Sequence, residues 1–322
     1  MTTSTTTALA TLIRAELARP VPPGAHALTA RLRERFGPAL RAVLMYGSNL
    51  RAGDDREGVL DLYALVSDYD AAYESRALAA ANRWLPPNVF YLEAAGEGGD
   101  DHIIRSKYAV LALDELPRLT ARPDSEPYFW ARFAQPCALV WVADEAARTI
   151  VVNALVSAVT TFVRFGVAFA PTPFDARALW TSAWRATYGA EVRPERPGAA
   201  DGFYEANAAR FEDLTALVVP SLPWPVTTVE EGGRTAFRLA MPEWERAQAL
   251  RAWRRRRLQA KGLFLLRILR NGLIFEGGAD YVLWKIQRHS GVLTDRSWRE
   301  KRHPLLALGA EAWRLYRARA FR

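Results

Sequence analysis

The stretch over residues 42–66 limits the fold more than any other part of the sequence. It opens with an apolar run that predicts a buried strand, and this run stops abruptly at Gly47 and Ser48. After a short polar segment, the run over 59–66 predicts a second strand that carries one acidic residue, Asp61, inside it. A strand, a glycine turn and a strand with an internal carboxylate therefore follow one another within 25 residues.

Each of these residues suits a site for phosphate groups. Gly47 lets phosphate oxygens approach the backbone, and Ser48 with the following amides offers hydrogen-bond donors at a predicted helix start. Asp61 can hold Mg²⁺, which bridges phosphates and offsets charge as pyrophosphate leaves. This pattern is typical of nucleotidyltransferases. The competing interpretation is a structural corner whose carboxylate is satisfied by neighbouring donors.

The position two residues after Asp61 separates this strand from most nucleotidyltransferase strands. Most of them place a second acid there, because residues two apart point to the same face of a strand. Here that residue is Tyr63, so the strand by itself does not predict two-metal chemistry. Three acids compete as the second metal ligand, and the sequence favours none of them: Asp68, Glu93 and Glu191.

The remaining pattern predicts an α+β fold with a nucleotidyltransferase-like mixed sheet and flanking helices. Further strands are expected at 88–93, 107–113 and 137–142. Helices are expected at 7–19, 25–36, 71–84, 150–170, 173–188 and 199–219, and a hairpin at 226–239. We expect three parts: a core over 1–143, a helical domain with the hairpin over 144–245, and a basic helical tail over 246–322.

The apolar run over 150–170 has the length of a membrane span. It contains Asn153, Ser157 and Arg164, and an arginine near the centre of a bilayer costs about 2.5–3.5 kcal/mol on insertion scales. We therefore predict a buried helix of a soluble protein. The single cysteine, Cys137, excludes an internal disulfide framework and suits a reducing compartment.

Charge is unevenly distributed along the chain. Residues 246–322 carry 19 Lys and Arg against 5 Asp and Glu, whereas residues 1–245 carry 24 against 30. A basic tail on an acidic body predicts an anionic partner for the tail. The segment 258–275 is too short and too charged to span a membrane, so it predicts a helix lying among lipid headgroups or a helix packed on the body. No nucleic-acid-binding module is recognisable, and no nucleic-acid partner is expected.

An ordered series of short motifs resembles the Tam41-type phosphatidate cytidylyltransferases, the mitochondrial maintenance proteins with a nucleotidyltransferase fold. YGSN at 46–49 resembles the family's YGSG turn, and VLDLY at 59–63 resembles its MLDFI strand, which also lacks the second acid. Four further segments resemble family motifs in the same order. SKYAV at 106–110 resembles IKYGV, and ARFAQP at 131–136 resembles GRLQKP. TYGAEVR at 187–193 resembles SYTGDFR, and KGLF at 261–264 resembles KGIL. The chain departs from the family at Ala190 and Glu191 and over 90–92.

The resemblance implies that CTP and phosphatidic acid give CDP-diacylglycerol and pyrophosphate with Mg²⁺. It assigns Gly47 and Ser48 to the nucleotide phosphates, and Asp61 to the metal. It also implies that Lys107 meets the triphosphate or the acceptor phosphate, with a surface lysine as the alternative. Two further phosphate binders are implied, Arg132 and Arg193, each with a structural ion-pair residue as the alternative.

The resemblance also implies where the protein works. Its expected place is peripheral, on the cytoplasmic face of a bacterial inner membrane or on the matrix side in a eukaryote, with residues 246–290 on anionic lipid. Two alternatives stay open: a nucleotidyltransferase that uses a different or soluble acceptor, and a non-catalytic lipid-bound scaffold of the same fold. The sequence makes no prediction of oligomeric state.

Overall fold

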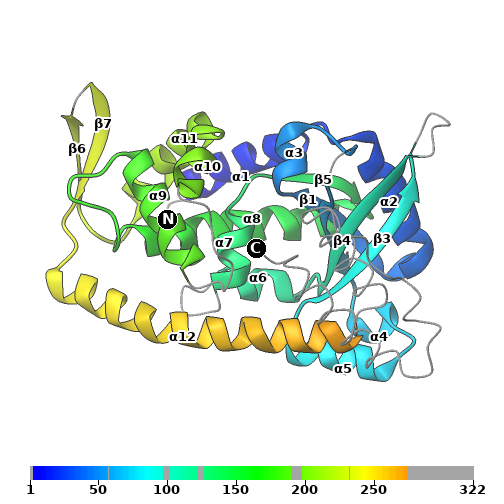
Figure 1. The fold of residues 1–322 in the computed structure, drawn as a ribbon. Helices are drawn as coiled ribbons and strands as arrows, with labels where there is room; N and C mark the ends of the chain where they lie inside the picture. Colours follow the sequence, from blue (N-terminus) through cyan, green and yellow to red (C-terminus); the bar gives the residue numbers. More distant parts are fainter. Residues whose placement is uncertain are drawn as a thin grey trace, which may run out of the picture.

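The computed structural model describes residues 3–56, 58–96, 102–121, 127–189, 198–231 and 233–274. A five-stranded mixed sheet with helices on both faces is followed by a mostly helical region (Figure 1). The predicted α+β class is therefore confirmed. Residues 275–322, which include most of the predicted basic tail, lie outside the described residues.

The five strands lie in the spatial order β3-β4-β2-β1-β5. They are β1 (Leu40–Tyr46), β2 (Leu60–Val66), β3 (Asn88–Ala95), β4 (Ile103–Ala112) and β5 (Cys137–Val142). β2 and β4 run parallel, and all other neighbours are antiparallel. Every predicted strand is present. β3 and β4 extend beyond their predicted ends because they pair with each other from Asn88↔Val110 to Ala95↔Ile103.

One face of the sheet is covered by α2 and α5. The elements on this side are α2 (Pro23–Phe36), η1 (Gly37–Ala39), α4 (Tyr69–Ala72) and α5 (Arg76–Trp84). Alternate strand residues such as Leu62 and Val110 are buried together with Leu28 and Leu32 of α2. The spacing of apolar residues at three and four positions along α2 thus produces the buried stripe that the sequence predicted.

The opposite face carries the larger apolar cluster. Its helices are α1 (Thr3–Leu17), α6 (Glu115–Thr120), α7 (Pro127–Phe133) and α8 (Glu145–Gly166). The other alternate residues of the strands, among them Leu44, Tyr63 and Leu111, are buried on this side. Side chains alternate between the two faces of a strand, so Asp61 and Lys107 also belong to this face.

Helix α8 is the one helix, within the described residues, whose length and composition would allow a membrane span. Most of it is buried in the protein, and Val151, Leu155 and Phe162 are almost fully inaccessible. Asp144 caps its first turn by accepting a hydrogen bond from the Ala147 amide at 2.8 Å. The prediction of a buried helix at this place is confirmed, and the cap explains why the helix begins earlier than expected.

The helical region continues the same apolar cluster. It consists of α9 (Ala176–Tyr188), α10 (Ala199–Glu205), α11 (Ala208–Val218), η2 (Val219–Ser221) and the hairpin β6 (Val226–Glu231) with β7 (Arg234–Leu239). The ring of Trp180 stacks between Phe162 and Phe211, at centroid distances of 4.9 and 4.3 Å. The hairpin and the helix predicted over 173–188 are confirmed here, whereas the single helix predicted over 199–219 is divided into α10 and α11 at residues 206–207. α8 joins this region to the sheet.

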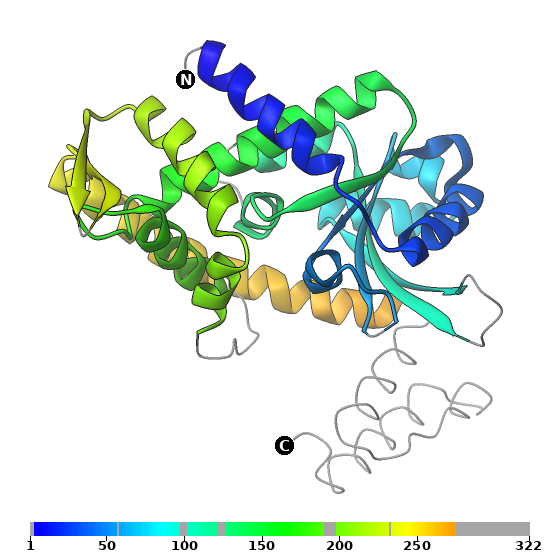
Figure 2. The same ribbon diagram turned by 90° about the horizontal axis from the view of Figure 1, so that it is seen from above.

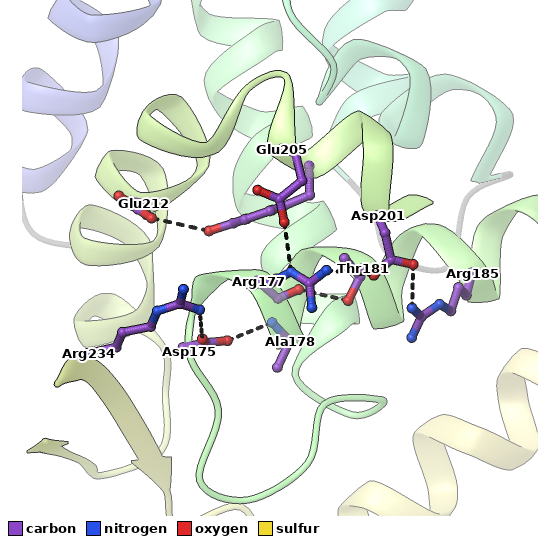
Figure 3. Close-up of polar contacts among 10 residues, drawn as sticks. Asp175, Arg177, Ala178, Thr181, Arg185, Asp201, Glu205, Glu212 and Arg234 are labelled. Carbon is purple, nitrogen blue, oxygen red and sulfur yellow. Dashed lines mark hydrogen bonds and ion pairs between the residues drawn. The ribbon is translucent and has the colours of Figure 1, made fainter. Parts of the chain in front are cut away.

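Exposed ion pairs link these helices at the surface (Figure 3). Arg177 of α9 contacts Asp201 at 3.2 Å and Glu205 at 2.9 Å on α10, and Arg185 contacts Asp201 at 2.6 Å. Asp175 caps α9 through the Ala178 amide at 2.7 Å. This network connects α9 and α10 at the surface and gives the cluster of charges a structural explanation.

Helix α12 (Glu243–Ile274) runs along the body from the hairpin to α5 (Figure 1, Figure 2). Trp253 is buried against Phe165, with 4.7 Å between ring centroids. Arg267 is only 5% exposed. Of the two arrangements that the sequence left open for this segment, the structure shows a helix packed on the body. Its arginines at 254, 255 and 257 remain exposed.

A buried ion pair connects the first helix to the helical region. Arg210 of α11 contacts Glu16 of α1, with 3.3 Å between Nη2 and Oε1, and both side chains are at most 10% exposed. Glu16 also accepts a hydrogen bond from the Cys137 amide at 3.0 Å, and Arg210 donates one to the Ala134 carbonyl at 3.0 Å. Burial raises the pKa of the Cys137 thiol to about 12, and the charge of the nearby Glu16 adds to the rise.

We expect Arg210→Met to lower the free energy of unfolding by about 3–5 kcal/mol, because it leaves the Glu16 carboxylate buried without its cation. Urea denaturation followed by circular dichroism measures the change. Arg177→Met is the matched control, because it removes two exposed ion pairs and should lower the midpoint only slightly. Equal losses in the two variants would contradict the importance assigned to the buried pair.

Candidate functional site

The centre of the site is the corner between β1 and β2. Gly47 follows the last residue of β1 with a φ of 92°, and Ser48 begins the short helix α3 (Ser48–Ala52). A Cβ atom at position 47 would lie 2.6 Å from Oδ2 of Asp61, which is closer than real Cβ contacts. Position 47 therefore requires glycine for two reasons: the positive φ of its backbone and the short distance to the carboxylate.

The strand register brings Lys107 directly beside Asp61. The two residues are partners in the parallel pair of β2 and β4, and Lys107 Nζ lies 2.8 Å from Asp61 Oδ1. Their side chains are 26% and 18% exposed, so the ion pair reaches solvent only in part. The structure thus brings together Gly47, Asp61 and Lys107. Lys107 is thus a partly buried partner of Asp61, and its role toward phosphate stays a prediction.

Arg132 reaches the same corner from α7. Its guanidinium carbon lies 5.2 Å from the ring centroid of Tyr46, the residue before Gly47, and 5.0 Å from that of Tyr128. Burial raises the pKa of the Tyr46 hydroxyl well above its usual range, Asp61 adds to the rise, and the positive charge of Arg132 opposes it. Tyr46 therefore stays protonated at neutral pH.

Arg51 approaches from α3. Its guanidinium carbon lies 5.1 Å from the ring centroid of Phe203 on α10, so this side chain connects the corner to the helical region. Burial lowers the pKa of Arg51, whereas Tyr188 and Asp61 oppose the change. Lys107 contacts Asp61 directly, the charge of Asp61 acts on Arg51, and Arg132 lies against Tyr46, the strand partner of Asp61. Three cations and one carboxylate give these four residues a net charge of +2. Such a site attracts an anion of several charges.

Tyr63 fills the place where a second acid would stand. It is fully buried, with ring centroids 5.4 Å from Tyr46 and 4.8 Å from Phe133. An acid there would be buried among rings, so this strand offers Mg²⁺ one carboxylate. Within the described part of the chain, no group of three or more His, Cys, Asp or Glu side chains is arranged to hold a metal ion.

Of the other predicted metal ligands, the two that the structure describes, Asp68 and Glu93, do not lie beside Asp61. Asp68 lies beyond the opposite end of β2, about 20 Å along the strand, where its carboxylate caps α4 through the Ala71 amide at 2.8 Å. The structure therefore contradicts Asp68 as a shared ligand. Glu93 lies on β3, two strands or about 10 Å away, and contacts the Tyr91 hydroxyl at 2.8 Å and Arg105 at 3.3 Å.

Ser48 is exposed at the start of α3, with its hydroxyl 3.4 Å from Asn49 Oδ1. Glu191 and Arg193 lie outside the described residues, so their predicted roles stay predictions. A Mg²⁺ ion suits this donor set when it arrives with a nucleotide, because it often takes one carboxylate from the protein and further oxygens from phosphates.

Some residues of the site were not predicted as site residues. Tyr46, Tyr128 and Phe203 come from three separate elements, and only the tertiary structure brings them together. Comparison of the chain with models of known protein families gave no match, and comparison with curated proteins gave none either. The likeness to the Tam41-type enzymes therefore stays a resemblance carried by short motifs.

We expect Gly47→Ala to lower the free energy of unfolding by at least about 2 kcal/mol, because it adds both backbone strain and a clash with Asp61. Gly53→Ala is the matched control. Gly53 also has a positive φ, of 66°, but nothing lies within 4 Å of a Cβ atom there, so the loss should be about 1 kcal/mol. Thermal and urea unfolding of both variants decide the comparison, and similar losses would contradict the close approach at residue 47.

Proposed function

We propose that the protein is a nucleotidyltransferase that binds CTP at the Gly47 corner and transfers its cytidylyl group to phosphatidic acid. The observation that carries the proposal is the Lys107–Asp61 ion pair beside a glycine that a side chain cannot replace, with Arg51 and Arg132 close to the same corner. A triphosphate matches the positive charge of this corner, and Gly47 adds no side chain to it. The lipid acceptor is supported by the motif resemblance and by the basic helix α12.

The reaction needs little from the protein beyond alignment and charge neutralisation. An oxygen of the acceptor phosphate attacks the α-phosphorus of CTP, and the bond between that phosphorus and the oxygen bridging to the β-phosphorus breaks. The electron pair leaves with pyrophosphate. A phosphate monoester is already anionic, so the attack needs no strong general base, which agrees with a corner built from cations and one carboxylate.

The residues then have distinct roles. Lys107, Arg51 and Arg132 bind phosphate oxygens and stabilise the charge that develops on the leaving pyrophosphate. Asp61 orients Lys107 through the 2.8 Å ion pair and holds Mg²⁺ that arrives with the nucleotide. The metal ion supplies further charge neutralisation on the triphosphate. Tyr63 and Tyr46 form a buried aromatic base beneath the corner, which keeps its side chains from shifting.

The exposed face of α12 supports a peripheral position on an anionic membrane. Arg254, Arg255 and Arg257 are exposed on it, and Leu258 and Trp244 are 73% and 65% exposed. Basic residues interleaved with apolar ones suit the headgroup layer. The proposed location is the cytoplasmic face of a bacterial inner membrane, or the matrix side in a eukaryote, where a lipid acceptor would be presented to the site.

We expect Asp61→Asn to lower the turnover of labelled CTP on phosphatidate vesicles with Mg²⁺ by about 100-fold or more, because Lys107 loses its partner and the metal its ligand. Asp68→Asn is the matched control. Asparagine also caps helices well, and residue 68 lies at the far end of β2, so turnover should change less than about twofold.

The choice of acceptor decides between the open alternatives. Pyrophosphate release only with a water-soluble acceptor would leave a nucleotidyltransferase but contradict the lipid assignment. CTP binding without turnover on any acceptor would favour the non-catalytic scaffold. No binding of CTP or another nucleoside triphosphate would contradict the whole proposal.

We expect the triple variant Arg254→Glu, Arg255→Glu and Arg257→Glu to weaken binding to vesicles with anionic lipid by at least about 100-fold, because each basic residue near the surface contributes about 1 kcal/mol. Vesicle sedimentation measures it, and binding of the unchanged protein should fall with added salt. The control variant, Arg76→Glu with Arg164→Glu and Arg238→Glu, changes net charge equally at exposed sites elsewhere. Equal weakening in both triple variants would contradict a role for this face.

A further inference from the structure

Two arginines of α12 extend into the body of the protein. Arg267 donates a hydrogen bond from Nε to the Pro86 carbonyl at 2.8 Å. Arg270 donates from Nη2 to the Pro87 carbonyl at 2.8 Å and from Nη1 to the Ala81 carbonyl at 2.9 Å. The Ala81 carbonyl also accepts the Leu85 amide at 3.1 Å, so Arg270 adds a second donor at the end of α5 and binds carbonyls of the segment that follows it. Both side chains therefore anchor α12 to the same segment.

Arg267 also lies over two aromatic rings. Its guanidinium carbon lies 4.8 Å from the ring centroid of Tyr128 and 5.7 Å from that of Phe129, both on α7. Tyr128 is also the ring against which Arg132 lies, at 5.0 Å. Arg132 in turn lies 5.2 Å from the ring of Tyr46, at the corner. Cations and rings thus alternate from α12 to the site.

We propose that Arg267 is a positioning residue for the nucleotide site, which acts through Tyr128 on Arg132. The inference rests on the proposed function, because it takes Arg132 as a residue that binds phosphate. Arg267 is 5% exposed and is fixed by the Pro86 carbonyl, so it presents a desolvated cation to the Tyr128 ring. Contacts of this kind are stronger in a buried place than at a surface.

The geometry explains why such support is needed. Arg132 has a long side chain with several rotatable bonds, and two rings limit where its guanidinium group can lie. Tyr46 is fixed within β1, but Tyr128 belongs to the first turn of α7 and is only partly buried. When Arg267 holds that ring, Arg132 is pre-organised for a phosphate. Docking of α12 and binding of a triphosphate are then coupled, and each favours the other.

Arg267→Met and Arg270→Met form a matched pair that separates positioning from anchoring. Both remove a cation that binds carbonyls near the end of α5. Arg267 lies over the Tyr128 ring, whereas the contacts of Arg270 are with carbonyls and its charge reaches Tyr128 only electrostatically. Isothermal titration of the full chain with Mg²⁺–CTP, and with inorganic triphosphate, gives the affinity. We expect about tenfold weaker binding for Arg267→Met and less than a twofold change for Arg270→Met. Equal losses would overturn the proposal.

Variants of the ring provide an independent arm that does not touch α12. Tyr128→Phe keeps the ring and should bind triphosphate more tightly than Tyr128→Leu, which should reproduce the loss seen for Arg267→Met. If Arg267→Met fails to fold, the comparison of these two variants decides. Equal affinities for Tyr128→Leu and Tyr128→Phe would overturn the proposal.

A spectroscopic measurement decides the same question without a nucleotide. The Nε–Hε resonance of Arg132 in protein labelled with ¹⁵N-arginine, assigned by its loss in Arg132→Lys, reports the position of this side chain over the two rings. We expect Arg267→Met to shift it and Arg270→Met to leave it in place. If the unchanged protein binds neither CTP nor triphosphate, the proposed function fails and this resonance alone decides the positioning role. An unmoved resonance in Arg267→Met overturns it.

Discussion

The contact between the Asp61 carboxylate and the backbone of Gly47 is the constraint on which the candidate site depends. It requires a residue without a Cβ atom at the end of β1 and a carboxylate at the matching position of β2. The antiparallel pairing of these strands places Tyr46 opposite Asp61, and the parallel pairing on the other side places Lys107 next to it. Three strands therefore define the position of one carboxylate, which a loop could not do with the same precision.

The balance of charge around that carboxylate limits the chemistry. Arg51, Lys107 and Arg132 outnumber Asp61, and the buried ring of Tyr63 occupies the place of a second acid. In the proposed function this corner binds phosphates, and within the described residues no second carboxylate joins Asp61 to take a proton from a neutral acceptor. It suits an acceptor that already carries its own negative charge, and a phosphate monoester is such an acceptor.

The fold could be predicted from the sequence to the extent that it depends on local patterns. The apolar runs predicted every strand of the sheet, and the turn residues predicted the hairpin of β6 and β7. Both signals depend only on residues a few positions apart. The nearness of Asp61 to Lys107 depends on the register between β2 and β4, which no local pattern encodes. Asp68 was wrong as a shared ligand for the related reason that seven residues of extended chain cover about 20 Å.

Helix α12 shows why an amphipathic pattern leaves its partner undecided. Arginines interleaved with leucine and tryptophan suit a lipid headgroup layer, but they suit a protein surface that offers carbonyls and rings equally well. The structure divides the arginines between these two kinds of surroundings: Arg267 and Arg270 contact carbonyls of the core, while those at 254, 255 and 257 stay exposed. One face of the helix is thus committed to the protein, which leaves the other available to an anionic surface. The face of α12 that packs on the protein also contacts Tyr128, the ring beside Arg132. A partner that binds the exposed face therefore binds a helix that already contacts the site.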